Sequence, residues 1–233
     1  MLRLRRRRSR RRRRRDFTQA TVRAFLFLRG PLQTRPDIAY AVGMLCRCMS
    51  CPSSELLEAA RRVLYYLEST ASLGLTYSAD QAQLYGMSDS DWATKHSTTG
   101  WVFMYNQACV TWNSSKQSSV ALSSCEAEIM AASDAGKEAK FLRNFLSELG
   151  LGDPSPTALH VDNQAARDLA YNPEHHKRTK HIDRRHFFVR ELVEDKVLEV
   201  PFVRTADNIA DFFTKWFNAN DFVALRDYIM NVP

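Results

Sequence analysis

The spacing of apolar residues predicts helices in the first third of the chain and strands in the segment that follows. Residues 17–50 show helical periodicity, which Pro31 and Pro36 interrupt because proline stops a helix. A second helix is predicted to start at Pro52-Ser-Ser-Glu55 and to stop near Gly74. We therefore expect a small helical segment ahead of the strands.

From residue 75 the pattern changes to short aromatic and β-branched runs that are separated by polar turns, which is typical of antiparallel strands. Asn106-Gln107 is expected to be a tight turn, and Ser97–Gly100 a turn that leads into the next strand. The expected strands are Leu75–Tyr77, Gln83–Ser88, Gly100–Tyr105 and Cys109–Asn113.

A long helix is predicted over about residues 124–149. Its start, Ser123-Ser-Cys-Glu126, matches a capping box, in which the glutamate reaches back to the N–H of the cap residue. This gives Glu126 a structural role, and leaves Glu128 projecting from the first turn. The remaining expected elements are a strand Thr157–Val161, a helix Gln164–Ala170 capped by Asn163, a helix Ile182–Lys196, a strand Val197–Val203 and a helix Ala206–Phe217.

The positive charge of the chain is concentrated at its start. Residues 1–15 contain 11 arginines and no acid, so the rest of the chain holds 22 basic and 26 acidic residues out of totals of 33 and 26. We expect residues 1–16 to be a disordered tail because like charges repel each other. Such a tail is typical of nucleic-acid binding or nuclear import, although a transit peptide and unselected low-complexity sequence are alternatives.

Other compositional features limit the compartment. The chain has no run of 18 apolar residues, so we expect no membrane span and no membrane partner. Five cysteines without a secretory signal favour reduced thiols and a cytoplasmic or nuclear location. Cys46, Cys48 and Cys51 have a spacing that suggests metal ligation, but no fourth ligand is near, and small buried side chains are the alternative.

Several acids are candidates for metal-dependent chemistry. Asp89 and Asp91 follow a short apolar run, and residues two apart in a strand share one face. Asp162 ends another predicted strand, which is a common place for functional groups in α/β sheets. With Glu128 and Asp211, these acids could bind Mg²⁺, which prefers oxygen ligands. Spacing by itself supports this grouping weakly, because the chain has 26 acids.

Longer motifs give a more specific indication. In chain order, the sequence resembles the end of reverse transcriptase followed by the ribonuclease H domain of a copia-type (Pseudoviridae-class) LTR retrotransposon Pol polyprotein. The resemblance covers about residues 32–217. The matching segments are Thr34-Arg-Pro-Asp-Ile-Ala-Tyr-Ala-Val42, Ser88-Asp-Ser-Asp-Trp-Ala93, Ser97-Thr-Thr-Gly-Trp-Val-Phe103, Trp112-Asn-Ser-Ser-Lys-Gln117, Val120-Ala-Leu-Ser-Ser-Cys-Glu-Ala-Glu128, Asp162-Asn163, Arg178-Thr-Lys-His-Ile-Asp183 and Ala210-Asp-Phe-Phe-Thr-Lys215.

The resemblance implies an α/β, ribonuclease H-like fold: a mixed sheet with antiparallel first three strands, flanked by helices and preceded by a small helical segment. The implied domains are the tail 1–16, a helical reverse transcriptase remnant 17–74, a ribonuclease H-like domain 75–217 and a C-terminal helical extension 218–233. We expect no DNA synthesis by this chain, because the paired-aspartate motif of the polymerase is absent from it.

The implied reaction is hydrolysis of the RNA strand of an RNA–DNA hybrid with two Mg²⁺ ions, or with Mn²⁺. By family position, the metal-binding acids are Asp89 rather than Asp91, Glu128 rather than Glu126, and Asp211 rather than Asp207. The full predicted catalytic set is Asp89, Glu128, Asp162 and Asp211. The side chains expected to contact phosphates of the hybrid are Lys177, Arg178, Lys180, Arg184 and Arg185, with a solvated helix face as the alternative.

Two other functions are possible on the same sequence. The chain could be an inactive nucleic-acid-binding remnant in which the arginine tail supplies most of the affinity. An integrase or transposase nuclease with the same fold fits less well, because its acids would form a triad and the copia-type motifs would be in the wrong place.

Overall fold

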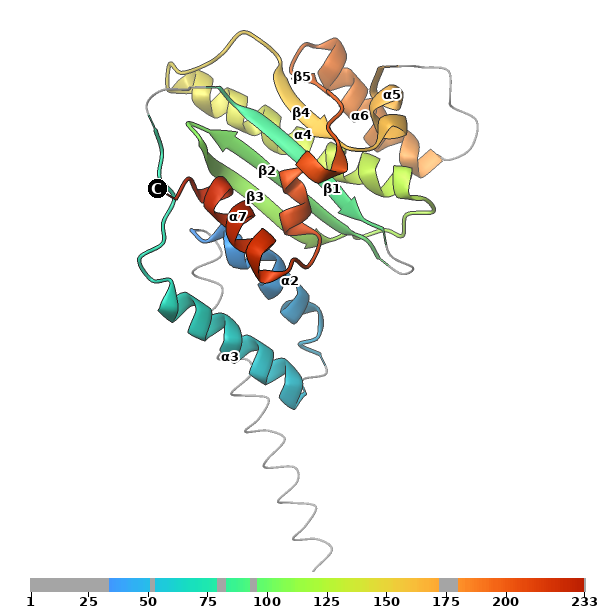
Figure 1. Ribbon diagram of the computed structural model, residues 1–233. Helices are drawn as coiled ribbons and strands as arrows, with labels where there is room; N and C mark the ends of the chain where they lie inside the picture. The colour runs from blue at the N-terminus through green and yellow to red at the C-terminus, as the bar shows by residue number, and fades with distance from the viewer. Residues whose placement is uncertain (1–33, 51–52, 79–82, 93–95, 172–179, 233) are drawn as a thin grey trace, which may run out of the picture. The chain divides into compact units, whose positions relative to one another are not determined.

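The computed structural model describes residues 34–50, 53–78, 83–92, 96–171 and 180–232 (Figure 1). These residues form two compact units that meet in sequence at Gly74 and Leu75. Within the described part of the chain, no helix is both long and apolar enough to cross a membrane.

The described residues of the first unit form a pair of helices that follows a short 3-10 turn, η2 (Pro36–Ile38). The helices are α2 (Ala39–Arg47) and α3 (Ser54–Ser69), and the side chain of Ser53 caps α3 by accepting a hydrogen bond from the N–H of Leu56. The predicted helix ends later than the real one, since α3 stops before Gly74. Two small apolar clusters join the helices, and their members are Ile38, Val42, Leu45, Leu56, Ala59, Ala60, Val63, Leu64, Tyr66 and Leu67.

A buried ion pair between Arg35 and Asp37 is hydrogen-bonded to the end of α3. The Arg35 guanidinium donates to both oxygens of Asp37, at 2.9 and 2.7 Å. The Tyr66 hydroxyl donates to Asp37 at 2.6 Å, and Arg35 also donates to the hydroxyl and carbonyl oxygens of Thr70. The motif that resembles the end of the polymerase therefore has a structural use here.

The second unit is built on a five-stranded mixed sheet in the order β3-β2-β1-β4-β5. β2 is antiparallel to β1 and to β3, whereas β4 is parallel to β1 and to β5. This sheet with its flanking helices confirms the predicted fold class. The strands are β1 (Tyr85–Asp91), β2 (Thr98–Tyr105), β3 (Ala108–Lys116), β4 (Thr157–Val161) and β5 (Leu198–Glu199).

Helices cover both faces of the sheet (Figure 1). On one face lie α4 (Ser124–Glu148), α5 (Gln164–Tyr171) and α6 (Lys180–Glu194). The other face carries η4 (Ile209–Phe213) and α7 (Ala219–Met230), whose rings Phe212 and Phe222 stack at 5.2 Å. The core between the sheet and the α4 face consists of Leu84, Trp101, Phe103, Ala132, Ala135, Ala139, Leu142, Leu159, Val161, Ala170, Val189, Leu192, Leu198 and Val200.

The tight turn between β2 and β3 is confirmed. Asn106 and Gln107 both have positive φ, at 52° and 71°, which is the conformation of a two-residue hairpin turn. The predicted turn at Ser97–Gly100 is wrong, because residues 98 to 100 already pair with both neighbouring strands.

The strand predicted at Leu75–Tyr77 does not form. The N–H of Thr76 donates to the carbonyl of Met230, and the Asn231 side chain donates to the carbonyl of Thr76, so the backbone of Thr76 bonds to the end of α7 and not to a strand. Residues 218–232 therefore belong to the same unit as the sheet.

The strand predicted at Val197–Val203 is shortened to β5. The N–H of Val200 donates to the Tyr171 hydroxyl at 2.8 Å, and Pro201 has no N–H to offer a neighbouring strand. One isolated bridge between Val161 and Phe202 continues the pairing.

The helix predicted at Ala206–Phe217 is also wrong. Two 3-10 turns occupy this region, η3 (Thr205–Asp207) and η4, and Asn208 between them is extended, with φ −82° and ψ 99°.

The cysteines near the start of the chain were expected either to bind a metal or to be small buried side chains. Burial is wrong for two of the three, since Cys46 and Cys48 are exposed, and Cys51 lies outside the described residues.

Candidate metal centre

Two acids lie where the parallel strands β1 and β4 separate. The last pair in this ladder joins Ser88 to Val161, so Asp89 and Asp162 are the next residues on the two strands. Asp89 is 2% exposed, and Asp162 is partly exposed. Strand pairing therefore brings side by side two acids that are 73 positions apart in the sequence.

A third acid reaches the same place from the first turns of α4. The cap is the predicted one: Ser123 accepts from the N–H of Glu126, and the Glu126 carboxylate accepts from the N–H of Leu122, one residue earlier than expected. Glu128 lies on the buried side of the helix and is 5% exposed. Its Oε1 accepts from the N–H and hydroxyl of Ser90, at 3.1 and 2.8 Å.

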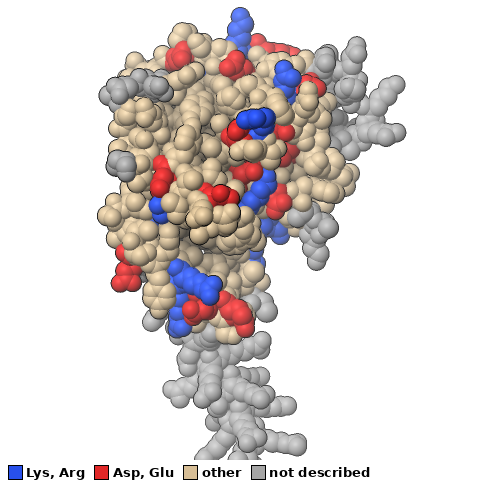
Figure 2. All heavy atoms as spheres, viewed as in Figure 1, with Lys and Arg blue, Asp and Glu red and all other residues tan. Residues whose placement is uncertain are grey.

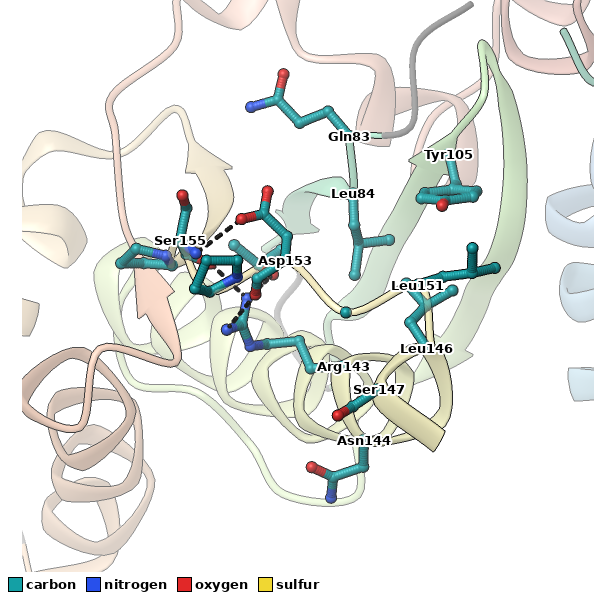
Figure 3. Close-up of a pocket in the computed structure, with 14 residues that line it drawn as sticks. Gln83, Leu84, Tyr105, Arg143, Asn144, Leu146, Ser147, Leu151, Asp153 and Ser155 are labelled. Carbon is teal, nitrogen blue, oxygen red and sulfur yellow. Dashed lines mark hydrogen bonds between the residues drawn. The ribbon is translucent and has the colours of Figure 1, made fainter. Parts of the chain in front are cut away.

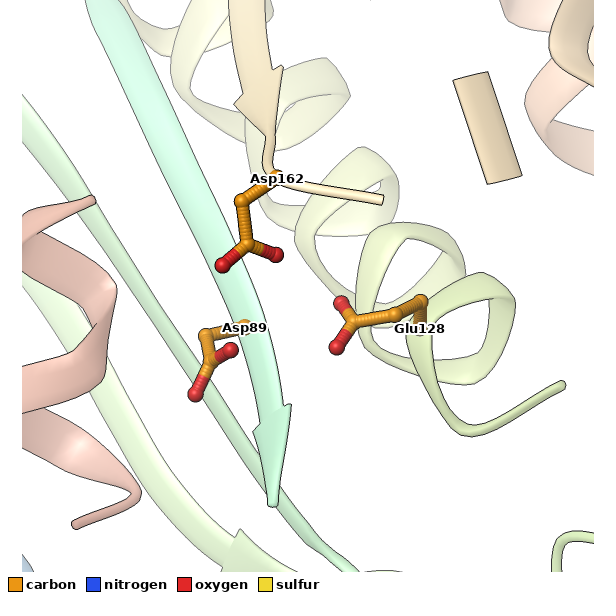
Figure 4. A group of neighbouring side chains, drawn as sticks. All are labelled: Asp89, Glu128 and Asp162. Atoms are coloured by element: carbon orange, nitrogen blue, oxygen red, sulfur yellow. The ribbon is translucent and has the colours of Figure 1, made fainter. Parts of the chain in front are cut away.

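The three carboxylates form a compact cluster of oxygens. Asp89, Glu128 and Asp162 each offer a ligand atom, and these atoms all lie within 4.8 Å of one another (Figure 4). Glu128 Oε2 is buried and has no hydrogen-bond partner in the described part of the chain. A buried oxygen without a donor is costly unless a cation stabilises it, and an all-oxygen donor set suits Mg²⁺. These three residues could therefore hold a hard divalent cation.

The 3-10 turn η4 brings the fourth predicted acid to Asp89. Asn208 caps η4 through its side-chain oxygen, and its side-chain N–H donates to the carbonyl of Ser88 at 3.1 Å. Behind it, the Thr214 hydroxyl donates to Asp89 Oδ2. Lys215 lies between the two acids, with Nζ 2.8 Å from Asp211 Oδ1 and 3.6 Å from Asp89 Oδ2.

Burial and mutual repulsion raise the proton affinity of Glu128, Asp211 and Asp89. Burial is the main cause that raises the pKa of Glu128 to about 8 and that of Asp211 to about 7, and the nearby charge of Asp89 contributes to both. Burial also raises the pKa of Asp89, against the opposing effects of Thr214 and Lys215. Removing carboxylates from water disfavours their charged form, and a bound cation would reverse this effect.

Comparison with known proteins identifies the relatives of the chain. It is 39% identical over 200 residues to the retrovirus-related Pol polyprotein from transposon TNT 1-94 of Nicotiana tabacum, a match that covers 84% of this chain and 15% of the relative. It is 36% identical over 187 residues to the Pol polyprotein from transposon RE1 of Arabidopsis thaliana, with 78% and 13% covered. The chain is homologous to copia-type transposon Pol polyproteins. It spans only about 15% of the length of the first of these Pol relatives.

A shorter relative matches over most of its own length. The secreted RxLR effector protein 161 of Plasmopara viticola is 45% identical over 128 residues, which cover 53% of this chain and 89% of that protein. No protein-family model matches the chain.

Solved structures that resemble the chain include ribonuclease H domains. The N-terminal ribonuclease H domain of a Mycobacterium tuberculosis protein, fused to maltose-binding protein, gives a TM-score of 0.44 at 11% identity and covers 62% of this chain and 96% of that one. LC11-RNase H1 gives 0.44 at 12%, with 57% and 93% covered. At these scores the likeness has no bearing on activity.

Asp89 and Asp211, which the resemblance to the Pol family favours over Asp91 and Asp207, also differ from them in their surroundings. Asp91 ends β1 and is exposed, and Asp207 makes a surface ion pair with Arg204 at 2.7 Å. The four predicted acids instead lie at or beside the cluster. Their catalytic role remains a prediction.

The predicted phosphate-binding residues are only partly described. Lys177 and Arg178 lie outside the described residues, and Lys180 begins α6. On the same helix, Arg184 is exposed and Arg185 is half-buried. On the face that Figure 2 shows, basic and acidic side chains of the coloured residues are interspersed and do not form one continuous basic area.

Three further residues complete the site and were not singled out in the sequence. They are Ser90, which holds Glu128, and Thr214 and Lys215, which contact Asp89. Lys215 follows Asp211 by four positions, and this spacing places two side chains on one face of a helical turn. That spacing was the available signal.

A cavity of about 360 Å³ lies at the other end of the sheet, near the start of β4 (Figure 3). Its charged lining groups are Arg143 and Asp153, and the Arg143 guanidinium donates to the carbonyls of Ser155 and Asp153 and to the hydroxyl of Thr157. These hydrogen bonds hold the segment after α4 against the helix. Because the Arg143 guanidinium is used in this structural role, we assign the cavity no ligand.

Proposed function

We propose that this chain hydrolyses the RNA strand of RNA–DNA hybrids in a reaction that depends on Mg²⁺, with Mn²⁺ as a substitute. The observation that supports this most directly is the convergence of Asp89, Glu128 and Asp162 within 4.8 Å. The homology to Pol polyproteins is consistent with this type of activity. The proposed partner is a hybrid duplex, which ribonucleases of this class read through 2′-hydroxyls and backbone shape.

Asp89, Glu128, Asp162 and Asp211 would hold two ions. When bound, such ions supply an activated water and stabilise the leaving oxygen of a phosphodiester. The chain itself contributes rigidity: Asp89 is held by its pairing with Gly100, Asp162 directly follows the last pair of the β1–β4 ladder, and Glu128 is held by its two bonds from Ser90. Ligands held in place before binding lose little conformational freedom on binding, so the site is ready for a cation and substrate.

Two neighbouring carboxylates on β1, Asp89 and Asp91, have different proposed roles. Asp89 is buried among the other acids, whereas Asp91 is exposed at the strand end and is outside the cluster. Substitution of Asp91 is therefore a matched control for substitution of a cluster acid.

The test is incubation of the purified full chain with an end-labelled RNA–DNA hybrid and Mg²⁺. We expect cleavage that leaves 3′-hydroxyl and 5′-phosphate ends, a loss of at least about a hundredfold in Asp162→Asn, and wild-type rates in Asp91→Asn. If the wild-type chain binds the hybrid without cleaving it, the chain is a nucleic-acid-binding remnant instead. Equal loss in both variants would show that the cluster is not the site of chemistry.

A further inference from the structure

The two sides of Asp89 differ in what they offer a cation. On one side, Asp89 faces Glu128 and Asp162, and Glu128 Oε2 has no donor within the described residues. On the other side, toward Asp211, the Lys215 ammonium already bridges the two acids. An incoming cation would meet the unpaired Glu128 Oε2 on the first side and a competing positive charge on the second.

We infer that Lys215 is a positioning residue that serves as a built-in counter-ion for Asp89 and Asp211 and makes the affinities of the site for its two cations unequal. The inference rests on the metal-dependent part of the proposed function, since it requires that the acids bind divalent ions. The first ion binds at Asp89, Glu128 and Asp162. The second binds beside Asp211 after it displaces the ammonium.

Local structure holds Lys215 in this place. The N–H groups of Thr214 and Lys215 both donate to the carbonyl of Asp211, at 3.0 Å each, so the backbone closes a turn that puts residue 215 over residue 211. Thr214 is fully buried, and its hydroxyl donates to the same Asp89 oxygen that Lys215 approaches. The turn therefore places the start of the Lys215 side chain beside both acids.

The exposure of Lys215 fits a group that is displaced. Its side chain is 36% exposed, whereas those of Asp89 and Asp211 are 3% and 14% exposed. A lysine head group on a flexible stem can move into water without opening the core. The acids cannot follow, so displacement leaves both carboxylates in position for the second ion.

Without metal, the same ammonium should stabilise the fold. It offsets the repulsion between two buried like charges, which is costly when uncompensated. Loss of the ammonium should therefore have two effects of opposite sign: lower stability without metal, and tighter binding of the second ion. A purely structural role predicts that both would weaken together.

The test is a titration of the full chain with Mn²⁺ without nucleic acid, in which free Mn²⁺ is counted by electron paramagnetic resonance. We expect two ions with unequal affinities in the wild type. Lys215→Met keeps much of the apolar stem and removes the charge, and should tighten the weaker site about tenfold, which corresponds to about 1.4 kcal/mol. Lys215→Arg keeps the charge and should bind as the wild type does. Thermal unfolding without metal should show Lys215→Met below both.

Unchanged or weaker second-site binding in Lys215→Met would overturn the inference, while binding of two ions by the wild type would leave the proposed function intact. A wild-type chain that binds no divalent ion would overturn both. If Lys215→Met does not fold, Lys215→Gln replaces it, and ¹³C labelling of lysine Cε in the wild type gives an independent reading: with Mg²⁺, the Lys215 signal should shift as the second site fills. A signal that stays unchanged while both sites fill would refute displacement.

Discussion

Gly100 pairs with Asp89 across the β1–β2 ladder, and the two residues face the same side of the sheet. A Cβ at position 100 would lie 2.6 Å from Cγ2 of Thr214 and 3.0 Å from the carbonyl oxygen of Ala210. The missing side chain is therefore what lets η4 rest directly on the sheet beside Asp89. The neighbouring residue Ser114 strengthens this contact by donating to the carbonyl of Phe213 at 2.6 Å.

Gly100→Ala should displace η4 and with it the groups that contact Asp89. We expect a loss of about 1–3 kcal/mol in the free energy of unfolding, because the added methyl group overpacks a buried contact. Binding of divalent ions should also weaken, since Asp211 moves away from Asp89. Chemical denaturation and Mn²⁺ titration measure the two effects.

Gly86→Ala is the matched control on the same pair of strands. Its Cβ would lie 2.4 Å from the Phe103 ring, in the core on the α4 face and away from η4. This variant should lose stability while its folded fraction keeps wild-type affinity for Mn²⁺. If both variants lose affinity equally, the contact between η4 and Gly100 does not position the site.

The raised pKa of Glu128 has a consequence for stability without metal. An acid whose pKa rises from 4.5 in the unfolded chain to about 8 in the fold retains its proton longer in the folded state. Between these two pH values the folded state binds more protons, so stability falls as pH rises and levels off above about pH 8. Asp211, with a pKa of about 7, adds a fall of the same sign at lower pH.

Glu128→Gln should remove the part of this pH dependence that Glu128 contributes and leave the fall that Asp211 causes. The metal-free variant should be more stable than the wild type at pH 8, by on the order of a few kcal/mol, and similar to it near pH 4. It should also fail to bind the first Mn²⁺ ion. Thermal unfolding in a chelator across this pH range measures the first effect, and Glu126→Gln, at the half-buried capping position, is the control. A wild type with constant metal-free stability from pH 5 to pH 8 would contradict the argument.

The sequence predicted those parts of the site that depend on regular elements. Asp162 lies directly after an apolar strand and before a capped helix, and both elements formed at the expected residues. The capping box distinguishes Glu126 from Glu128 by sequence pattern alone. Local patterns such as these are sufficient because their hydrogen bonds join residues close in sequence.

Contacts between distant segments could not be predicted in the same way. The helical spacing around Asp211 suggested an α-helix, but Asn208 bonds to Ser88, 120 positions away, and divides the segment into two 3-10 turns. In the same way, the amide of Thr76 bonds to Met230 and not to the sheet. In both cases a tertiary partner outweighs the local preference.

The buried network in the first unit should carry a measurable share of its stability. Tyr66→Phe removes the hydroxyl that donates to Asp37 at 2.6 Å and leaves a charged acceptor short of one donor. We expect a loss of about 1.5–3 kcal/mol for this unit, since hydrogen bonds to charged groups lie in that range. Hydrogen exchange of the α2 and α3 amides measures it. Tyr65→Phe, at an exposed neighbouring position, should have no effect. If the α2 and α3 amides are equally protected in both variants, the hydrogen bond from Tyr66 to Asp37 makes no measurable contribution to stability.

The basic side chains of α6 offer a test of substrate contact that does not require cleavage. Arg184 is exposed, so its removal should not disturb the core. If it contacts a hybrid phosphate, Arg184→Gln should weaken hybrid binding for all sequences and reduce the slope of log affinity against log salt by about one. Fluorescence anisotropy at several salt concentrations, with Ca²⁺ in place of Mg²⁺, measures the slope. Arg61→Gln, exposed on α3, is the control. A slope that is unchanged in Arg184→Gln would assign Arg184 to the solvated face of α6, because a released counterion is the necessary consequence of a phosphate contact.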